Sequence, residues 1–424
     1  MSNEAETVKK SQRALTPKLR FPEFRKEPGW KPRSLSALLD YEQPSKYIVE
    51  DSNYQDTGTP VLTANKSFVL GHTAETTGIF EDVPVIIFDD FTTDKKYVDF
   101  PFKVKSSAIK ILLSRGNDEL KLIYELMSRI RFDSTQHKRY YISQYQDLEI
   151  ALPSPPEQQK IAECLSSLDG LIAAEGRMLE ALKAHKKGLM QQLFPGTPTS
   201  PSAGGIGAGA DAGAPRQPRL RFPEFRDKGE WEEKPLGELV IFASGGTPSK
   251  TDPKFWDGDI PWISASAMHD TAVYDSELRV TQEAIGNGTR LAEKGSILIL
   301  VRGSMLFKRV PICIAKRDVA FNQDVKSIRP KRSVVTRYLL NHLIASESRI
   351  AINSTGIGAG KIDTEHLKSL IIGIPSSPEQ QRIADCLTTL DTRIAAQAVK
   401  INALKQHKRG LMQQLFPAPE EVNA

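Results

Sequence analysis

The sequence predicts an α+β protein in which two mixed α/β domains are separated by a pair of long antiparallel coiled-coil helices and related by a pseudo-two-fold internal repeat. Three observations support this fold class. The framing segments of the chain occur twice, one of them carries a long heptad pattern in both copies, and the stretches between the frames alternate strand-like and helix-like segments. The 424 residues are enough for two to four domains.

Near-identical segments define the two frames. LRFPEFR begins at Leu19 and again at Leu220, and a tryptophan follows each copy. A longer segment that contains PEQQ and GLMQQLFP ends at Pro195 and again at Pro417, and we call the distance along the chain between these two prolines the helix-repeat interval. The stretches between the frames are dissimilar, so the chain reads frame, variable stretch, frame, twice over. The predicted parts are a disordered N-terminus (1–16), a first domain (17–151), a first long helix (152–195), a flexible Gly/Ala/Pro linker (196–218), a second domain (219–373), a second long helix (374–417) and a tail (418–424).

Each long repeat is predicted to form one helix of roughly 38 residues, about 57 Å long. At its start a serine (Ser154, Ser376) caps the helix, a proline lies in the first turn, and a glutamate (Glu157, Glu379) reaches back to the cap. Apolar residues then recur at alternating spacings of three and four, which favours helix pairing over an ordinary amphipathic core helix. The pairing residues are Ile161, Leu165, Leu168, Ile172, Leu179, Leu182 and Leu189 in the first copy, and Ile383, Leu387, Leu390, Ile394, Ile401, Leu404 and Leu411 in the second.

The polar breaks in this seam predict the orientation of the pair. A parallel pair in register would set Lys186 against Lys408, two like charges in a desolvated contact. An antiparallel pair would instead place each lysine beside apolar residues of the partner helix, along which its aliphatic stem can extend. We therefore expect the antiparallel arrangement.

The variable stretches, about 31–150 and 232–373, have the pattern of mixed α/β domains. Apolar runs at 83–88, 108–113 and 296–301 predict strands, and the segments 120–130 and 335–350 predict helices.

Basic, polar and aromatic residues gather in the loops between these elements. Such side chains suit contacts with phosphates and base edges, although solvated loops can have the same composition. Because Arg139 and Lys361 are separated by the helix-repeat interval, they lie at the same distance before the two long helices, and the Lys138–Arg139 pair and Lys361 are expected to touch phosphates at equivalent places. The candidate DNA-binding residues are Lys95, Lys96, Tyr97, Lys105, Ser106, Lys138, Arg139 and Tyr140 in the first domain, and Thr247, Ser249, Lys250, Trp262, Arg302, Lys308, Arg309, Gln323 and Lys361 in the second.

Bulk properties narrow the class of protein. A net charge of +5 permits a polyanionic partner without requiring one. Cys164, Cys313 and Cys386 form no CxxC pair, which predicts reduced thiols in the cytoplasm. No apolar stretch approaches the length of about 18 residues at which a membrane span is expected. The N-terminus has no apolar core, so a secretion signal is not expected either.

Familiar catalytic and metal-binding patterns are missing from the sequence. The segment 355–361 ends like a phosphate-binding loop, but Ile362 stands where such a loop needs Ser or Thr to hold magnesium. The acids in 89–96 lack the second acidic motif of a nuclease site and suit a surface turn. No adenine-methylation motif, no glycine fingerprint for S-adenosylmethionine and no metal-ligand spacing among the seven histidines is present. A binding protein is therefore expected, with no metal site and no catalytic residue.

The doubled layout resembles the specificity subunits of type I restriction-modification enzymes. The resemblance rests on the two LRFPEFR openings with their tryptophans, the two PEQQ helices that end in GLMQQLFP, and the two dissimilar inserts, which together cover nearly the whole chain. Segments 245–249 (GGTPS) and 260–263 (IPWI) also resemble openings of the family's recognition domain, whereas the first domain lacks the GGTP-type opening.

The resemblance implies a non-catalytic protein of phage defence. Each target-recognition domain would read one half of a bipartite DNA site, and the helices would set the spacing and dock two methyltransferase subunits. Restriction subunits would join through these, and S-adenosylmethionine, ATP and Mg²⁺ would bind the partner subunits. A stand-alone DNA-modifying enzyme and a coiled-coil scaffold without DNA contact remain as alternatives.

Overall fold

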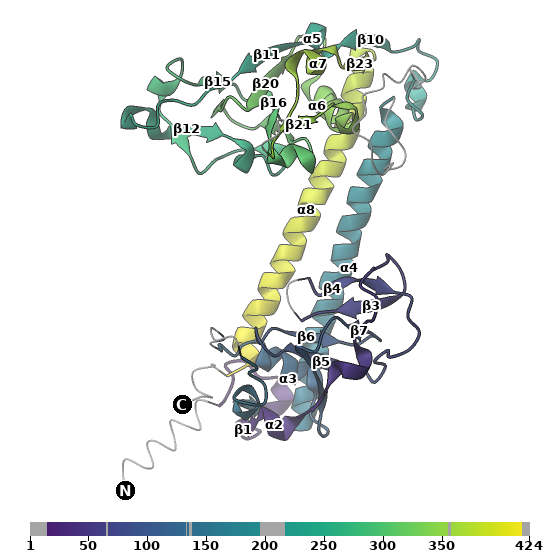
Figure 1. Ribbon diagram of the computed structural model, residues 1–424, viewed down its shortest axis with the longest axis vertical. Helices are drawn as coiled ribbons and strands as arrows, with labels where there is room; N and C mark the ends of the chain where they lie inside the picture. Colours follow the sequence, from purple (N-terminus) through teal and green to yellow (C-terminus); the bar gives the residue numbers. More distant parts are fainter. Residues whose placement is uncertain are drawn as a thin grey trace. The chain divides into compact units, whose positions relative to one another are not determined.

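A computed structural model describes residues 15–64, 67–132, 134, 138–195, 217–354 and 358–417. The predicted disordered N-terminus, linker and tail lie outside these ranges, apart from residues 15–16 and 217–218. The chain divides into two compact units: unit 1 comprises Met1–Gly176 and Val399–Ala424, and unit 2 comprises Arg177–Ala398. Each unit therefore contains one variable domain and one half of each long helix (Figure 1).

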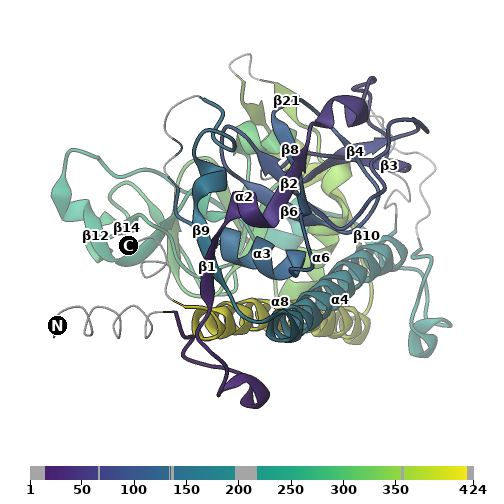
Figure 2. The same cartoon turned by 90° about the horizontal axis from the view of Figure 1, so that it is seen from below.

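Unit 1 contains a two-stranded sheet formed by its frame segments and two further small sheets. The frame strands β1 and β9 pair antiparallel, α2 follows β1, and α3 packs on an antiparallel sheet of order β2-β8-β5-β6 (Figure 2). The second sheet has the order β4-β3-β7, with β3 and β7 parallel. The elements are β1 (Lys31–Ser34), α2 (Leu35–Leu38), β2 (Leu39–Glu42), β3 (Thr59–Leu62), β4 (Val69–Thr73), β5 (Val85–Asp89), β6 (Lys95–Val98), β7 (Lys103–Val104), β8 (Ile109–Ser114), α3 (Leu120–Met127) and β9 (Glu149–Leu152).

Unit 2 repeats this plan with longer sheets. The frame strands β10 and β23 pair antiparallel, and the main sheet has the order β11-β20-β16-β18-β13. The other sheets are β14-β12-β19-β15 and β17-β22-β21. The elements are β10 (Glu232–Pro235), α5 (Leu236–Leu239), β11 (Val240–Ser244), β12 (Trp256–Ile263), β13 (Ala272–Val273), β14 (Arg279–Val280), β15 (Arg290–Ala292), β16 (Ile297–Leu300), β17 (Arg302–Gly303), β18 (Ile312–Ala315), β19 (Val319–Phe321), β20 (Val325–Pro330), α6 (Thr336–Ala345), β21 (Asn353–Ser354), β22 (Gly360–Lys361), α7 (Thr364–Ser369) and β23 (Ile371–Ile374).

Short 3-10 turns connect many of these elements. They are η1 (Pro22–Phe24), η2 (Pro44–Tyr47), η3 (Tyr145–Asp147), η4 (Pro223–Phe225), η5 (Pro253–Phe255), η6 (Ala265–Ala267), η7 (Gln282–Ala284), η8 (Ser304–Phe307) and η9 (Glu347–Arg349). Two of them, η1 and η4, are the PEF of the repeated LRFPEFR segment, so the repeat takes the same local form in both units.

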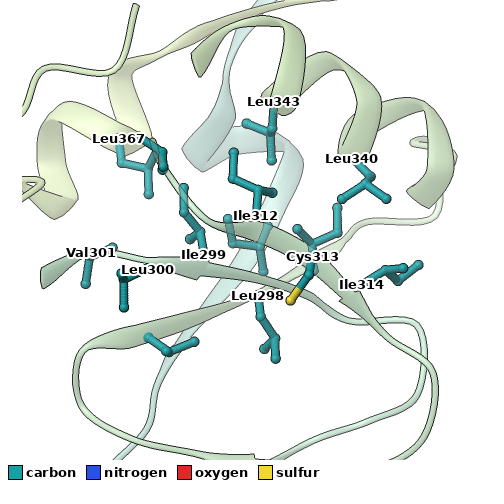
Figure 3. Close-up of a cluster of buried hydrophobic side chains, with 14 of the residues drawn as sticks. Leu298, Ile299, Leu300, Val301, Ile312, Cys313, Ile314, Leu340, Leu343 and Leu367 are labelled. Carbon is teal, nitrogen blue, oxygen red and sulfur yellow. The ribbon is translucent and has the colours of Figure 1, made fainter. Parts of the chain in front are cut away.

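The core of unit 2 lies between the central strands and two helices. Leu340 and Leu343 of α6 and Leu367 of α7 point toward the face formed by Ile299 and Ile312 (Figure 3). Cys313 lies in the same core, where burial raises the pKa of its thiol to about 12, and none of the three cysteines forms a disulfide. The predicted strands at 83–88, 108–113 and 296–301 and the predicted helices at 120–130 and 335–350 are confirmed as β5, β8, β16, α3 and α6, with ends shifted by a few residues.

The two long helices, α4 (Pro155–Leu193) and α8 (Ser377–Leu415), have 39 residues each. In unit 1, Lys400 contacts Glu175 while Lys408 contacts Asp169, so numbers rise along α8 as they fall along α4.

In unit 2 the same antiparallel order holds. Lys186 contacts Asp391, and Leu193 lies in a buried cluster with Ile383 and Leu387. The predicted pairing residues of both helices are all buried or half-buried. Antiparallel pairing is therefore confirmed within each unit (Figure 1).

Each of the two seam lysines has a counter-ion that was not predicted. The Lys186 Nζ is 2.6 Å from Asp391 Oδ1, and the Lys408 Nζ is 2.7 Å from Asp169 Oδ1. A partly buried ammonium group needs a counter-charge, and an antiparallel pair brings each lysine to the aspartate of the other helix.

The predicted capping box is wrong. Glu157 Oε2 lies 2.5 Å from the guanidinium of Arg20, and Glu379 Oε1 lies 2.7 Å from that of Arg221. The Ser154 hydroxyl is buried, and within the described part of the chain it has no hydrogen-bond partner. The glutamates instead tie the LRFPEFR segments to the long helices, which explains why the two repeated segments occur together.

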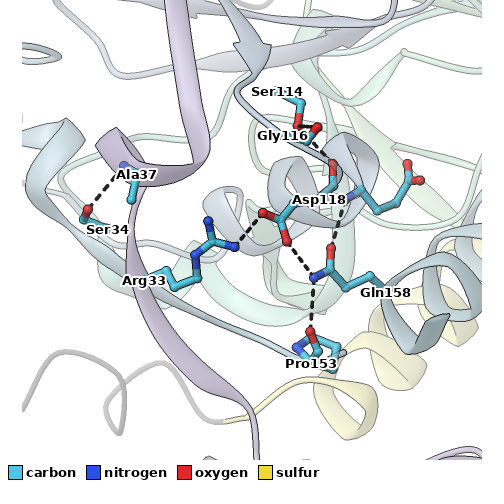
Figure 4. Close-up of polar contacts among 9 residues, drawn as sticks. Arg33, Ser34, Ala37, Ser114, Gly116, Asp118, Pro153 and Gln158 are labelled. Atoms are coloured by element: carbon cyan, nitrogen blue, oxygen red, sulfur yellow. Dashed lines mark hydrogen bonds and ion pairs between the residues drawn. The ribbon is translucent and has the colours of Figure 1, made fainter. Parts of the chain in front are cut away.

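A glutamine beside each glutamate anchors the domain to its helix. Gln158 Nε2 donates to Asp118 Oδ1 (2.9 Å) and to the Pro153 carbonyl (3.1 Å), and its Oε1 accepts from the Glu119 amide (2.9 Å) (Figure 4). Arg33 completes this network by donating to Asp118 Oδ2 at 2.6 Å. In unit 2, Gln380 Oε1 accepts from the amide of Val335, the residue before α6, at 2.9 Å.

Candidate nucleic-acid interface

One end of the main sheet of unit 2 gathers polar and basic side chains. Here β11 ends opposite the start of β20, so Ser244 pairs with Lys326, and β16 ends beside Val325. The loops that carry 245–250, 302–303 and 322–324 leave from this end. We call it the unit 2 edge, defined by Ser244, Thr247, Arg302, Gln323, Lys326 and Lys361.

Two glycines shape the first of these loops. The Gly246 amide donates to the Phe321 carbonyl at 3.0 Å. A Cβ at Gly245 would collide with that carbonyl oxygen, and one at Gly246 would collide with the Gly288 carbonyl oxygen. Glycine is thus required because backbones approach closely, and the loop is held against the strand that leads to Gln323.

The tryptophan of the IPWI segment holds the same loop. Trp262 Nε1 donates to the Gly246 carbonyl at 3.1 Å, and the side chain is buried against Trp256. The two segments that resemble family openings are therefore in contact. Trp262 was predicted to bind DNA, but its polar atom is used inside the domain, which corrects that prediction.

Three positively charged side chains lie at the unit 2 edge. Arg302 and Lys361 are exposed neighbours across the β17–β22 pair. Lys326 Nζ donates to the Ser244 hydroxyl at 2.5 Å, and burial, reinforced by the positive charges of Arg302 and Lys368, lowers the pKa of Lys326. An anion at this edge would be stabilised by these charges together.

A neutral pair lies beside these cations. Thr247 Oγ1 donates to Gln323 Oε1 at 2.7 Å, and the Gln323 side chain is exposed. Because its oxygen is held by the threonine, the orientation of the Gln323 amide is fixed and its NH₂ donors point away from that bond. A fixed amide donor beside cations suits contact with a base edge.

The other predicted residues of unit 2 lie in neighbouring loops. Ser249 shares a hydrogen bond with Thr251 at 2.9 Å. Arg309 Nη2 donates to the carbonyls of Met268 (2.8 Å) and His269 (2.7 Å), so its guanidinium is partly engaged. Lys250 and Lys308 are exposed.

Unit 1 has the corresponding edge at the end of β5. The Asp90 amide donates to the Ala108 carbonyl at 2.9 Å, and the Tyr140 amide donates to the Asp90 carbonyl at 2.8 Å. The same two bonds occur in unit 2, from Val301 to Asp324 and from Ile362 to Val301, both at 2.8 Å. Arg139 and Lys361 directly precede Tyr140 and Ile362, so they occupy equivalent backbone positions in the two units, and their contact with phosphates stays a prediction.

The unit 1 edge differs in its charges. Asp90 is buried, and its Oδ2 lies 3.7 Å from Lys110 Nζ and 3.9 Å from Arg139 Nη1. Lys110 is also buried, 4.9 Å from the centre of the Tyr41 ring. Sequence reasoning missed Lys110, although one lysine inside an otherwise apolar strand was a signal. The exposed predicted residues here are Lys105, Ser106, Lys138 and Arg139.

Several other predicted residues of unit 1 support its core. Lys95 Nζ donates to the Tyr145 hydroxyl (2.9 Å) and the Met127 carbonyl (3.1 Å), and burial lowers the pKa of Lys95 to about 8. Tyr140 is 2% exposed, and Tyr97 packs against Tyr124. Tyr140 is therefore corrected to a core residue, whereas Lys95, Lys96 and Tyr97 are half-buried residues of the edge strand β6, and the polar atom of Lys95 is used inside the domain.

The paired acids at 89–90 have structural roles. Asp89 Oδ1 accepts from the amides of Phe91 and Thr92, both at 2.9 Å, which fixes a turn. Asp90 Oδ1 accepts from the Tyr141 amide at 2.8 Å. Among the described residues no group of three or more His, Cys, Asp or Glu side chains is placed to hold a metal ion. No helix in the same ranges combines the length and apolar character needed to cross a bilayer.

Comparison with known proteins identifies this architecture. The model of the type I restriction modification DNA specificity domain matches residues 28–184 and 228–406, one copy for each half of the chain. The chain is 36% identical over 418 residues to the EcoR124I/EcoR124II type I restriction enzyme specificity subunit of Escherichia coli, covering 94% of this chain and 96% of that protein. It is 31% identical over 175 residues to the MjaIX specificity subunit of Methanocaldococcus jannaschii, covering 39% of each.

A solved structure shares the fold. The S subunit of a type I restriction-modification system from M. genitalium superposes with a TM-score of 0.56 at 16% identity, covering 95% of this chain and 100% of that one. This similarity concerns the arrangement of the backbone.

Proposed function

The chain belongs to the family of type I restriction-modification DNA specificity subunits, and from this premise we propose that each unit reads one half of a bipartite DNA site through its edge. The observation that carries the proposal is the placement of Arg139 and Lys361. Arg139 directly precedes Tyr140, whose amide donates to the carbonyl just after β5, and Lys361 directly precedes Ile362, whose amide donates to the carbonyl just after β16. Different side chains surround the two cations. A shared phosphate-contacting position beside different neighbours suits two domains that grip the same kind of polymer and read different sequences.

The roles of the edge residues follow from their chemistry. Arg139, Lys361 and Arg302 carry exposed cations, which suit phosphate contacts that position a domain on the duplex. Gln323 presents amide donors next to the Thr247 hydroxyl and can pair with the edge of an adenine. Lys105 and Ser106 occupy the loop before β8, and we propose that they read bases at the unit 1 edge.

We also propose that the long helices set the distance between the half-sites and dock methyltransferase subunits, to which restriction subunits bind. The partner subunits would supply S-adenosylmethionine, ATP and Mg²⁺. The chain itself would catalyse no step. The absence of methylase and nuclease motifs from the sequence supports this division of labour.

The experiment that tests this function is methylation mapping. The chain is produced with its methyltransferase subunits in a host that lacks other restriction-modification systems, and the methylated bases of the host DNA are located. We expect one bipartite motif with an unread spacer. A purified complex that shows no salt-dependent binding to that DNA would favour the alternative of a scaffold without DNA contact.

A further inference from the structure

A closed cluster of four charges lies where the helix pair meets the domain in unit 1. Lys408 of α8 contacts Glu125 of α3 (2.8 Å) and Asp169 of α4 (2.7 Å). Lys121 of α3 contacts the same two carboxylates, at 3.3 Å and 2.9 Å. Burial raises the pKa of Asp169, but hydrogen bonds from Lys408 and Lys121 outweigh this effect and lower it overall. Two cations therefore balance two carboxylates inside the unit.

The repeat fixes the corresponding residues in unit 2. The helix-repeat interval separates Lys186 from Lys408 and Asp169 from Asp391, so Lys186 and Asp391 are their counterparts. The side chains of Lys186 and Asp391 are 2.6 Å apart.

Helix α6 takes the place of α3. Glu119 is the N-cap of α3, and its amide donates to Gln158 of α4. Val335 is the N-cap of α6, and its amide donates to Gln380 of α8. Counting from these caps, Arg337 corresponds to Lys121 and Asn341 to Glu125.

The unit 2 cluster has no second carboxylate. Asn341 is buried and donates to the Arg337 carbonyl at 2.9 Å, so the position of Glu125 is filled by a neutral amide. Arg337 is half-buried, and within the described residues its guanidinium makes no ion pair. We call Lys186, Arg337, Asp391 and the nearby Lys316 the unit 2 cluster.

Lys316 adds a further positive charge. Helix α6, which carries Arg337, packs against β18, and Lys316 directly follows that strand. Burial lowers the pKa of Lys316, the positive charges of Arg337 and Lys294 lower it further, and the negative charge of Asp391 raises it. Ile312 of β18 pairs with Ile299 of β16, and Lys316 lies four residues after Ile312.

Counting four residues from the corresponding strand pair of unit 1 leads to an acidic residue. There, Lys95 pairs with Phe88 of β5, and four residues after Lys95 stands Asp99. The corresponding positions of the two units thus have opposite sign. The unit 2 cluster holds three cations and one carboxylate.

The position of the unit 2 cluster separates it from the DNA-binding edge. Lys316 comes directly after β18. The last residue of β18, Ala315, accepts a hydrogen bond from the Gly295 amide, so Lys316 lies near the start of β16. Arg302 follows the opposite end of β16. A duplex bound at the unit 2 edge would therefore lie at the other end of the sheet, which favours a protein over DNA as the source of the missing anion.

We propose that the unit 2 cluster receives an acidic side chain of a methyltransferase subunit, whereas Glu125 fills the corresponding place in unit 1 from within the chain. This inference rests on the proposed function. Two identical partner subunits would then meet different surfaces on the two units, and the two association steps would differ in affinity and in salt dependence.

Titration of the full chain with its methyltransferase subunit, followed by native mass spectrometry at several salt concentrations, tests the proposal. We expect Arg337→Gln to weaken one association step by about tenfold and to leave the other unchanged. Asn341→Glu, which supplies the carboxylate from within, should weaken the same step. Arg332→Gln removes an exposed charge outside the cluster and is the matched control, and thermal unfolding verifies that each variant is folded.

The contrary outcomes are distinct. Arg337→Gln with two unchanged association steps would contradict the docking site. A loss of DNA affinity by the chain alone, with unchanged partner binding, would identify phosphate as the ligand and also overturn it. A wild-type chain that recruits no methyltransferase subunit at all would overturn the proposed function itself.

Discussion

Lys186 of α4 forms an ion pair with Asp391 of α8, with 2.6 Å between Nζ and Oδ1. Moving each partner by the helix-repeat interval onto the other helix gives the second pair, Lys408 and Asp169, at 2.7 Å. Only helices that run antiparallel can form both pairs, because the roles of the two helices are exchanged between them. The ion pairs thus carry the internal repeat of the sequence into the helix pairing of each unit.

The two pairs should differ in their contribution to stability. Lys408→Met leaves Glu125 and Asp169 with Lys121 as their one counter-ion in the cluster, and we expect it to reduce the opening free energy of unit 1 by about 3 kcal/mol. Lys186→Met leaves Asp391 near Arg337 and Lys316 and should cost about 1 kcal/mol in unit 2. Native-state hydrogen exchange measures both. In Lys408→Met, the added change Glu125→Gln should restore part of the loss. Equal losses at the two lysines would show that the charges around them are balanced in the same way in both units.

Unit 2 should lose stability as the pH falls. His342 is fully buried, and this burial, together with the positive charge of Arg349, lowers its pKa to about 3 from an ordinary value of 6.5. The unfolded chain binds a proton below about pH 6.5 while the folded chain does not, so the contribution of His342 to stability is complete above about pH 6.5 and is lost as the pH falls toward 3.

Urea unfolding followed by tryptophan fluorescence tests this, since three of the four tryptophans (Trp231, Trp256 and Trp262) are in unit 2. We expect His342→Gln to be less stable at pH 7 and to show a flatter pH dependence between 7 and 4. The matched control is His407→Gln on the exposed surface of α8. An unchanged slope for His342→Gln would show that another group controls the acid response.

Neutralising the equivalent cations should weaken DNA binding without regard to sequence. We expect Arg139→Gln and Lys361→Gln each to lower the slope of log affinity against log salt by about one. Lys331→Gln, an exposed charge away from the edges, serves as the control. A changed base preference with the same salt slope would mean that these residues read bases instead.

The helix pair and the repeated frames could be predicted from the sequence because heptad spacing and repetition are properties of the chain itself. The orientation could be predicted from the like charges of Lys186 and Lys408, but the two ion pairs could not, since Asp169 and Asp391 lie beside the seam and only the paired helices bring them to the lysines. The common plan of the two variable domains could not be predicted, because backbone hydrogen bonds carry it, such as those from Tyr140 and Ile362, and side chains there differ.

Composition also could not assign the site residues. Lys95 and Trp262 were selected as basic or aromatic loop residues, yet both use their polar atoms inside the domains. Which way a side chain points depends on strand register and on contacts distant in sequence, such as Lys95 with Tyr145. Arg139 and Lys361 could be matched because the constant helix gave them a common reference point.

Lengthening the helices should change the preferred spacer. One heptad inserted into each of α4 and α8, at positions separated by the helix-repeat interval, keeps the seam in phase and adds about 10 Å. The preferred spacer should grow by roughly three base pairs, with lower affinity because the half-sites also rotate relative to each other. Binding selection over randomised spacer lengths gives the result, and a folded variant that keeps the original spacer would show that the helices do not set the distance.

Exchange of one variable domain tests whether each unit reads its own half-site. Residues 31–150 are replaced by the corresponding stretch of another specificity subunit with a known target, the frames are kept, and the methylated motif is mapped in cells that also produce the methyltransferase subunit. We expect a motif in which one half-site changes to that of the donor while the other half-site and the spacer length stay the same. A motif in which both half-sites change would show that the two units do not read their half-sites independently.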